Sequence, residues 1–210
     1  MIKRFKRFFK NFFNQLFKEK KDIKLGLYGP PNGGKTTLAN RICKDWLDEE
    51  MGEVSNIAHE TREIKVKEQV TIENEEGKSI SFNLVDTPGI ATKIDYEDFM
   101  EEGMKEEEAK KRAKEATKGV IDSIRWLDDM DIVIAVLDST RDPYSQVNVT
   151  IMGNLEARDI PVLVLANKID LDESDIKQIE SAFPQYEVVG ISAKYGNNVE
   201  TFYEKIFELV

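Results

Sequence analysis

The sequence contains one cysteine and one histidine, and this scarcity excludes several kinds of protein. A lone Cys43 supports neither a framework of intramolecular disulfides nor a cysteine-based metal site. Chains without disulfides are typical of reducing compartments, so we expect a cytoplasmic setting. His59 lies in a segment that reads as a loop, where a lone histidine is more often a surface residue than a catalytic one.

Long apolar runs are also missing at the amino terminus. No apolar run within residues 1–21 exceeds two residues, which excludes a signal peptide and a membrane-spanning helix of about 18 or more apolar residues. The 210 residues are 40% apolar and 33% charged, enough for one well-buried core and too few for two large domains. We therefore expect a short amino-terminal segment, residues 1–21, and one domain over residues 22–210.

The most informative segment is GPPNGGKT at residues 29–36, between an apolar run at 23–28 and a stretch that reads as a helix. Gly29 and Gly34 lack a Cβ, so a loop between them can point its backbone N–H groups at phosphates. Lys35 would then reach the β- and γ-phosphates, and the hydroxyl of Thr36 would bind Mg²⁺. The predicted nucleotide-binding residues of this loop are Gly29, Pro30, Pro31, Asn32, Gly33, Gly34, Lys35, Thr36 and Thr37. The chain is therefore predicted to bind a nucleoside triphosphate.

Three more short motifs follow, each after an apolar run. They are DTPG at residues 86–89, NKID at 167–170 and SAK at 192–194. With these motifs in this order, residues 23–210 resemble the Era- and EngA-like GTPases. Each short motif is weak evidence alone, but the ordered set is a strong signal.

The resemblance implies a role for each motif. Asp86 would lie near Mg²⁺, and the N–H of Gly89 near the γ-phosphate. Asp170 would accept two hydrogen bonds from guanine N1 and N2, which adenine cannot supply, so GTP is favoured over ATP. The nucleotide-binding residues that the resemblance adds are Asp86, Gly89, Asn167, Lys168, Asp170, Ser192, Ala193 and Lys194.

Residues 54–63 are similar to the first switch segment of the family. His59 and Glu60 stand where glycine and threonine are usual, which changes how the loop closes. Thr61 is retained, and we expect it to bind Mg²⁺ together with Thr36 and Asp86. A loop ordered in this way responds to the presence of the γ-phosphate.

Hydrolysis is expected to be slow. Position 90 is isoleucine, whose alkyl chain cannot orient the attacking water as glutamine does in Ras-type enzymes. Several relatives instead use K⁺ bound by a phosphate-loop asparagine, a position that Asn32 occupies here; the alternative is that Asn32 only suits the turn. The predicted catalytic residues are Asn32, Lys35, Thr61 and Gly89. Mg²⁺ is the expected cofactor, K⁺ a candidate one, and GTP and GDP are the substrate and product.

The order of apolar runs and helix-like stretches predicts an α/β fold of the P-loop GTPase kind. Strands are expected at residues 23–28, 63–73, 79–86, 131–138, 161–166 and 186–191. The second and third would form a hairpin at the edge of a mostly parallel six-stranded sheet, with helices on both faces. Ile64, Val66, Val70 and Ile72 alternate with polar residues, as expected for one apolar face of the edge strand.

About forty residues lie between the second switch and Asp131, more than a minimal GTPase needs. Pairs of glutamate and a basic residue four positions later predict an exposed helix: Glu106 with Lys110, Glu107 with Lys111, and Glu108 with Arg112. An apolar face of Val120, Ile121, Ile124 and Leu127 is expected to dock on the sheet. We interpret the stretch as a solvated extension of the second helix rather than a dedicated partner site.

Residues 1–21 combine eight apolar residues at helical spacing with a net charge of +7, which leaves −17 on the other 189 residues of a chain whose total is −10. The apolar residues are Ile2, Phe5, Phe8, Phe9, Phe12, Phe13, Leu16 and Phe17. This pattern predicts a basic amphipathic helix that lies in an interface. Its partner could be an anionic membrane surface on the cytoplasmic side, a protein or the chain's own acidic body, or RNA.

Three functions remain open at this point. The chain could be a hydrolysing switch whose nucleotide state controls the amino-terminal helix, a ribosome-assembly GTPase that places this helix on RNA, or a GTP-dependent scaffold with little turnover. Some relatives pair their nucleotide domains through the switches, so a nucleotide-dependent dimer is also open. Nothing in the sequence corresponds to the RNA-binding KH domain of Era.

Overall fold

A computed structural model describes residues 23–48, 65–73, 77, 79–87, 96–101 and 103–209. The strands are β1 (Lys24–Tyr28), β2 (Lys65–Glu73), β3 (Ser79–Asp86), β4 (Ile132–Asp138), β5 (Val162–Asn167) and β6 (Glu187–Ile191). The helices are α2 (Lys35–Leu47), α3 (Tyr96–Glu101), α4 (Glu106–Trp126), α5 (Gln146–Glu156), α6 (Ile176–Ala182) and α7 (Val199–Leu209), with a 3-10 turn at Leu127–Asp129. The six predicted strands are confirmed, with ends that differ by at most two residues.

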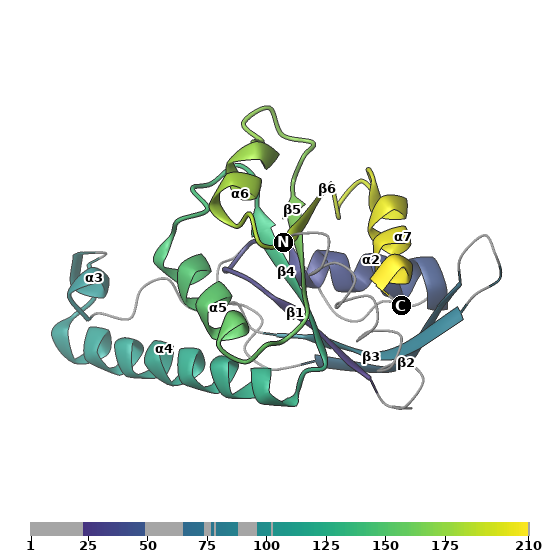
Figure 1. The fold of residues 1–210 in the computed structure, drawn as a ribbon. Coiled ribbons are helices and arrows are strands. Elements are labelled where there is room, and N and C mark those ends of the chain that lie inside the picture. Colours follow the sequence, from purple (N-terminus) through teal and green to yellow (C-terminus); the bar gives the residue numbers. More distant parts are fainter. Residues whose placement is uncertain are drawn as a thin grey trace.

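These strands form one sheet in the order β2-β3-β1-β4-β5-β6 (Figure 1). Strand β1 pairs in parallel with β3 and β4, and β5 pairs in parallel with β4 and β6. Strand β2 runs antiparallel to β3, which confirms the edge hairpin. Because the parallel strands point the same way, the loops at their carboxyl ends meet at one edge of the sheet.

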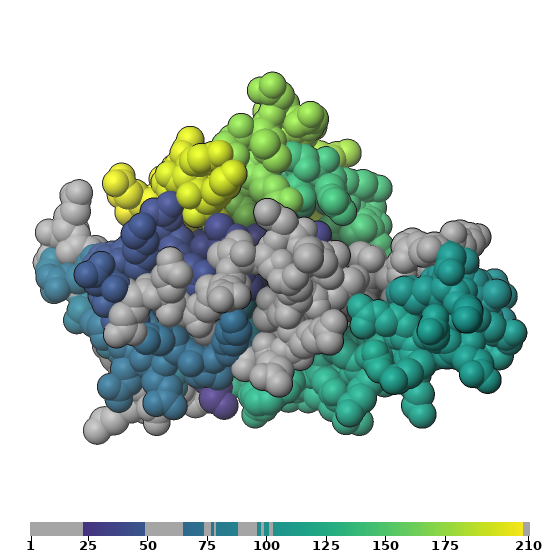
Figure 2. All heavy atoms as spheres, turned by 180° about the vertical axis from the view of Figure 1, so that it is seen from behind, coloured from purple at the N-terminus to yellow at the C-terminus, as the bar shows by residue number. Residues whose placement is uncertain are grey.

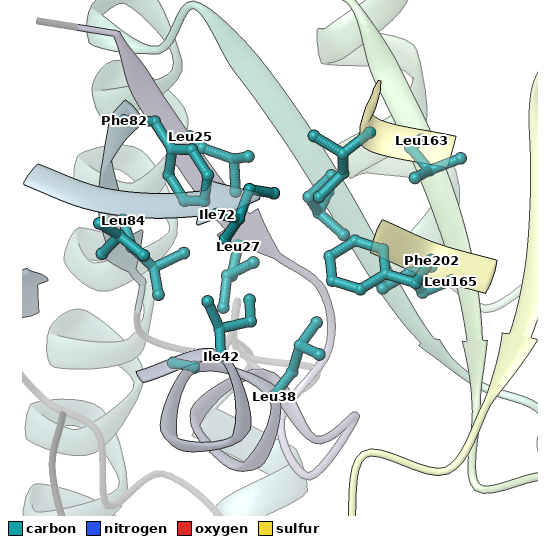
Figure 3. Close-up of a cluster of buried hydrophobic side chains, with 14 of the residues drawn as sticks. Leu25, Leu27, Leu38, Ile42, Ile72, Phe82, Leu84, Leu163, Leu165 and Phe202 are labelled. Atoms are coloured by element: carbon teal, nitrogen blue, oxygen red, sulfur yellow. The ribbon is translucent and has the colours of Figure 1, made fainter. Parts of the chain in front are cut away.

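Helices cover both faces of the sheet, because its central strands are apolar on both sides. All seven residues of β4 are buried, as expected for a strand between two helical layers. On one face, Leu38 and Ile42 of α2 and Phe202 of α7 pack against the sheet (Figure 3). On the other face, Val147 and Ile151 of α5 and Ile179 of α6 form a second buried cluster with residues of the sheet.

The edge strand β2 differs from the prediction, because it contains a bulge. The pairing shifts by one residue between Lys67, opposite Leu84, and Val70, opposite Phe82. Gln69 has a φ of 54°, and its N–H donates to the side chain of Asn83. An extra residue reverses the direction of every later side chain. Val66 is therefore 51% exposed, whereas Val70 and Ile72 are buried in the core, so the single apolar face predicted for this strand was wrong.

Helix α4 is the long exposed helix that the charge pattern predicted. Its 21 residues span about 31 Å at 1.5 Å per residue. The Glu106–Lys110 pair forms, whereas Arg112 lies 3.7 Å from Glu115 rather than pairing with the predicted Glu108. The helix runs along the base of the molecule and continues well past the sheet (Figure 1).

The docking face of α4 is narrower than predicted. Leu127, directly after the helix, is buried and Val120 packs against the second cluster, but Ile121 is 45% exposed. At about 100° per residue, Ile121 lies a quarter turn from the line through Val120 and Leu127. The buried Ser123 lies closer to that line. Ile121 was therefore wrongly assigned to the face that docks on the sheet.

The outer half of α4 packs on α3 instead of on the sheet. Phe99 of α3 is buried with Ala109 and Ala113 of α4 in a small separate cluster. The two helices form a lobe that stands off one side of the body (Figure 2). Among the helices of the described residues, none is long and apolar enough to span a bilayer.

Candidate functional site

The loop between β1 and α2 has the shape that a phosphate-binding loop needs. Gly29 has a φ of 154°, and a Cβ there would lie 2.2 Å from the carbonyl oxygen of Val136 in β4. Gly34 has a φ of 100°, and a Cβ there would lie 2.1 Å from Nδ2 of Asn167. Only glycine fits these two positions, because any side chain would overlap a neighbouring strand or loop.

Lys35 begins α2 and is buried at the centre of this loop. Its Nζ donates to the carbonyl oxygens of Gly29, at 3.1 Å, and Pro30, at 2.9 Å. Burial lowers the pKa of Lys35 to about 8, although the nearby Asp86 carboxylate acts to raise it. An ammonium held in a desolvated position has a strong electrostatic attraction for a phosphate group. The predicted phosphate contact of Lys35 fits this geometry.

Thr36, the second residue of α2, lies next to Asp86, the last residue of β3. The Thr36 hydroxyl donates to Oδ2 of Asp86 at 2.6 Å, and the Asp86 carboxylate is fully buried. Its Oδ1 has no hydrogen-bond partner among the described residues. Burial raises the pKa of Asp86, and the bond from Thr36 and the charge of Lys35 act to lower it. A buried carboxylate oxygen without a partner, next to a hydroxyl, fits an oxygen-binding cation such as Mg²⁺.

Asn167 joins the phosphate loop to the loop after β6. Its side-chain Nδ2 donates to Gly33 O at 2.9 Å, and its Oδ1 accepts from the N–H of Ala193 at 2.9 Å. Both bonds are buried, so neither competes with water. The structure thus shows Asn167 as a link between two loops, and its nucleotide-binding role stays a prediction.

The predicted base-binding residues lie at the same edge of the sheet. Asp170 is exposed in the loop after β5, and the buried Ser192 and Ala193 lie in the loop after β6. Arg41 of α2 holds this second loop, because its guanidinium donates to the carbonyl oxygens of Ala193, at 3.3 Å, and Lys194, at 2.9 Å. The sequence analysis missed Arg41, since a basic residue on a helix carries no motif.

Asp138 was also not predicted as a site residue, although its position in the sequence resembles that of Asp86. It ends β4 as a charged residue directly after an apolar run, in the way that Asp86 ends β3. Its carboxylate is buried and pairs with Lys168, one of the predicted nucleotide-binding residues. The structure therefore adds a carboxylate behind the base-binding loop.

Several predicted residues lie outside the described ranges. These are Thr61 and His59 of the first switch, Gly89 and Ile90 of the second, and the whole of residues 1–21. Asn32 is described; it is exposed and has a φ of 60°, which suits an asparagine in a turn. Its proposed contact with K⁺ is not tested by this geometry.

Residues 24–168 match the family model described as 50S ribosome-binding GTPase. The chain is 32% identical over 190 residues to the GTPase Era of Caldanaerobacter subterraneus, covering 87% of this chain and 53% of Era. It is 30% identical to the GTPase Der of Clostridium novyi, over 84% of this chain and 37% of Der. It is also 30% identical to the tRNA modification GTPase MnmE of Finegoldia magna, over 89% of this chain and 34% of MnmE. The chain thus spans about a third to a half of the length of these relatives.

Solved structures show the same fold. A single-residue variant of Aquifex aeolicus Era bound to GDP and AlF4⁻ superposes with a TM-score of 0.65 at 24% identity, covering 91% of this chain and 57% of Era. An Era structure with MgGDPNP and a segment of 16S ribosomal RNA gives a TM-score of 0.65 at 22% identity, with the same coverage. The G domain of T. maritima FeoB gives 0.54 at 22% identity, covering 90% of this chain and 98% of that domain.

We predict that Gly34→Ala lowers the affinity for GDP at least a hundredfold. The new methyl group would overlap the Asn167 amide and require a left-handed backbone that alanine disfavours, so the bond between Asn167 and Gly33 is lost. Fluorescence titration with a labelled GDP analogue measures the change.

Gly153→Ala is the matched control, because no atom lies within 4 Å of a Cβ at Gly153 in α5. It should keep GDP affinity and raise the free energy of unfolding by about 0.5–1 kcal/mol. Equal GDP affinity in the two variants would contradict the geometric argument.

Proposed function

Since the chain belongs to the family of 50S ribosome-binding GTPases, we propose that it binds GTP and hydrolyses it to GDP and phosphate as a molecular switch. One observation carries the proposal: the buried Asp86 carboxylate, bonded to Thr36 and close to Lys35, lies at the edge where the phosphate loop and the base loops meet. Thr36 and Asp86 would hold Mg²⁺, which neutralises phosphate charge when bound. Lys35 would exchange its bonds to loop carbonyls for bonds to phosphate oxygens.

Guanine specificity is assigned to Asp170. Its carboxylate is exposed, and it interacts electrostatically with Lys194 in the loop of Ser192–Lys194. Guanine N1 and N2 would donate to it, and adenine has no matching pair of donors. A carboxylate that loses its solvent without gaining these bonds is destabilised by several kcal/mol, which disfavours ATP.

Slow intrinsic hydrolysis follows from Ile90, which cannot orient water. We assign the compensating charge to K⁺ bound near Asn32, where the loop is exposed to solvent. A monovalent cation there would stabilise negative charge that develops between the phosphates, and it requires no arginine from a partner. Thr61 and the N–H of Gly89 would contact Mg²⁺ and the γ-phosphate, so that both switches respond to hydrolysis.

Residues 1–21 are assigned to attachment at an anionic membrane surface on the cytoplasmic side. The segment joins the body at the amino end of β1, where the N–H of Lys24 donates to the Asp131 side chain at 3.0 Å. This end of β1 lies at the edge of the sheet opposite the nucleotide loops. Attachment there leaves the nucleotide site accessible. The acidic body is repelled by anionic lipid, whereas the segment, with a net charge of +7, is attracted at about 1 kcal/mol per basic residue.

Binding to the ribosome or to RNA is the second candidate for residues 1–21. The matching family is described as ribosome-binding, and one similar structure is Era with 16S ribosomal RNA. The basic residues of the segment suit phosphate contacts, whereas its paired phenylalanines suit lipid or an apolar groove better than single-stranded RNA.

A scaffold that binds GTP with little turnover is the third candidate function of the chain. Ile90 supports it, because an isoleucine at this position cannot orient the attacking water.

Asp170→Ala should abolish the preference for guanine. Removing an acceptor of two charge-assisted hydrogen bonds lowers GDP affinity by roughly a hundredfold or more, at about 1.5–3 kcal/mol for each bond, and leaves weak ADP binding unchanged. Calorimetric titration of both nucleotides with Mg²⁺ measures the ratio. Asp172→Ala, an exposed aspartate two residues later, is the control and should keep the ratio. Retained preference in Asp170→Ala would place the base pocket elsewhere.

GTP turnover should rise at least tenfold when NaCl is replaced by KCl at equal ionic strength. In NaCl we expect about 10⁻⁴ per second, the intrinsic scale of Ras. Asn32→Gly should lose the stimulation but keep GDP affinity, because glycine tolerates the φ of 60° and the asparagine side chain would contact only the cation. Phosphate release under single-turnover conditions measures both rates. Stimulation that survives in Asn32→Gly would assign K⁺ to another site, and no product after hours in either salt would favour the scaffold.

Flotation with anionic liposomes tests the attachment of residues 1–21. The full-length protein should float and a variant without residues 1–21 should not, with more floating in the presence of a non-hydrolysable GTP analogue than with GDP. Liposomes of neutral lipid are the control for the charge contribution. The four samples on anionic liposomes are the full-length protein and the shortened variant, each with GDP or with the GTP analogue. If all four float equally, membrane attachment through this segment is wrong. Salt-sensitive sedimentation with ribosomal subunits would then support the RNA alternative.

A further inference from the structure

The loop after β4 supports the loop after β5 through residues 138–140, here called the DST turn. Strands β4 and β5 are parallel neighbours, and Asp138 lies opposite Asn167. The backbone N–H of Ser139 donates to Asn167 O at 2.9 Å, and its hydroxyl donates to the same oxygen at 2.7 Å. The start of the NKID segment is thus fixed to the DST turn by two bonds.

Asp138 is buried and fully engaged on both carboxylate oxygens. Oδ1 accepts from the N–H of Thr140 at 3.0 Å and from its hydroxyl at 2.7 Å. Oδ2 accepts from Nζ of Lys168 at 2.5 Å, and Nε of the exposed Arg141 lies 3.5 Å away. Burial acts to raise the pKa of Asp138, but the bonds from Lys168 and Thr140 outweigh it and lower this pKa. The carboxylate is therefore charged at neutral pH.

Lys168 has an uncommon backbone conformation in the loop that begins at Asn167. Its φ is 73°, in the left-handed region that a residue with a Cβ occupies only under local constraint. Its ammonium points back to Asp138 beneath the loop, although Asp170 is only two residues further along the chain. The Asp170 carboxylate is exposed, and no hydrogen bond to it is formed from Lys168 in the described structure.

We propose that Asp138 is a positioning residue for guanine specificity, because it holds the Lys168 ammonium away from Asp170. This inference rests on the proposed function, in which Asp170 accepts hydrogen bonds from guanine N1 and N2. An ammonium released from Asp138 would pair with Asp170, the next carboxylate along the loop. It would then compete with the two guanine donors for the same oxygens. The contribution of Asp138 is thus to selectivity as well as to shape.

The competing pair would form near the surface, which limits its effect. Exposed ion pairs contribute up to about 1 kcal/mol, which is about fivefold in an equilibrium constant. The affected quantity is the preference for GDP over IDP, because GDP donates to both oxygens of Asp170 and must displace the ammonium. Inosine lacks the 2-amino group, so IDP leaves one of these oxygens free to keep the ion pair and loses less affinity than GDP. A purely structural role for Asp138 would lower the affinities for GDP and IDP together and leave their ratio unchanged.

The test compares GDP and IDP affinities of the full-length protein and four variants by calorimetry in the presence of Mg²⁺. In Asp138→Asn the ratio of GDP to IDP affinity should fall, by up to about fivefold. In the double variant Asp138→Asn/Lys168→Met the ratio should return to the wild-type value, because the competing ammonium is gone and no buried charge is left unpaired. Lys168→Met alone should also keep the ratio, whatever its overall affinity. Asp142→Asn is the matched control, since this exposed aspartate of the same loop caps only its own turn, at the N–H of Tyr144.

Three results would overturn the inference. They are an unchanged ratio in Asp138→Asn, a ratio that stays low in the double variant, and a lowered ratio in Lys168→Met. If Asp138→Asn does not fold, Asp138→Ser takes its place, and the same fall in the ratio is expected because serine also removes the charge that holds Lys168. A wild-type protein without any preference for GDP over IDP would contradict the base pocket of the proposed function. A preference of unchanged size in Asp138→Asn would contradict only the role given to Asp138.

Discussion

The side-chain amide of Asn167 is the interaction on which the candidate site depends. It donates to the phosphate loop at Gly33 and accepts from the loop after β6 at Ala193. Its own backbone oxygen accepts two bonds from Ser139, so three loops from different parts of the sequence meet at one residue. Because the amide is buried, no water can replace either bond, and loss of this side chain would leave Gly33 O and the N–H of Ala193 unsatisfied. The distance between the phosphate and base regions is thus set by one side chain.

Around this link, the site separates charge into two regions. Lys35 and Asp86 are both buried at the predicted phosphate end of the site. Burial lowers the pKa of Lys35 and raises the pKa of Asp86, and the charge of each residue acts against the shift of the other. At the base end, Asp170 remains exposed, and the buried carboxylate Asp138 holds the nearby Lys168. In the proposed function, the phosphates and the cation would thus enter a desolvated region, and the purine would enter a region that is shaped by hydrogen bonds. The α3–α4 lobe has its own small core around Phe99, separate from the two clusters that pack on the sheet.

Sequence reasoning succeeded where the local pattern carries the physical constraint. Gly29 and Gly34 were predicted as loop residues because a Cβ would obstruct the approach of phosphates, and the structure adds that such a Cβ would also overlap Val136 and Asn167. It failed where the constraint comes from a partner far along the chain. The bulge that exposes Val66 depends on a hydrogen bond to Asn83 in the next strand. The exposure of Ile121 depends on how many residues around α4 contact the body of the protein. Arg41 reaches a loop about 150 residues away, which no local spacing reveals.

The amino-acid sequence alone determined the class of fold, the phosphate loop and the edge at which ligands bind, because apolar periodicity and glycine placement act within a few residues. Only the tertiary structure decided which side chains hold these loops together. Asn167, Asp138 and Arg41 take their roles from parallel strand pairing and helix docking, which bring their partners within hydrogen-bond distance. A hydrogen bond requires its two atoms to lie within about 3 Å, and that proximity is a property of the packed chain.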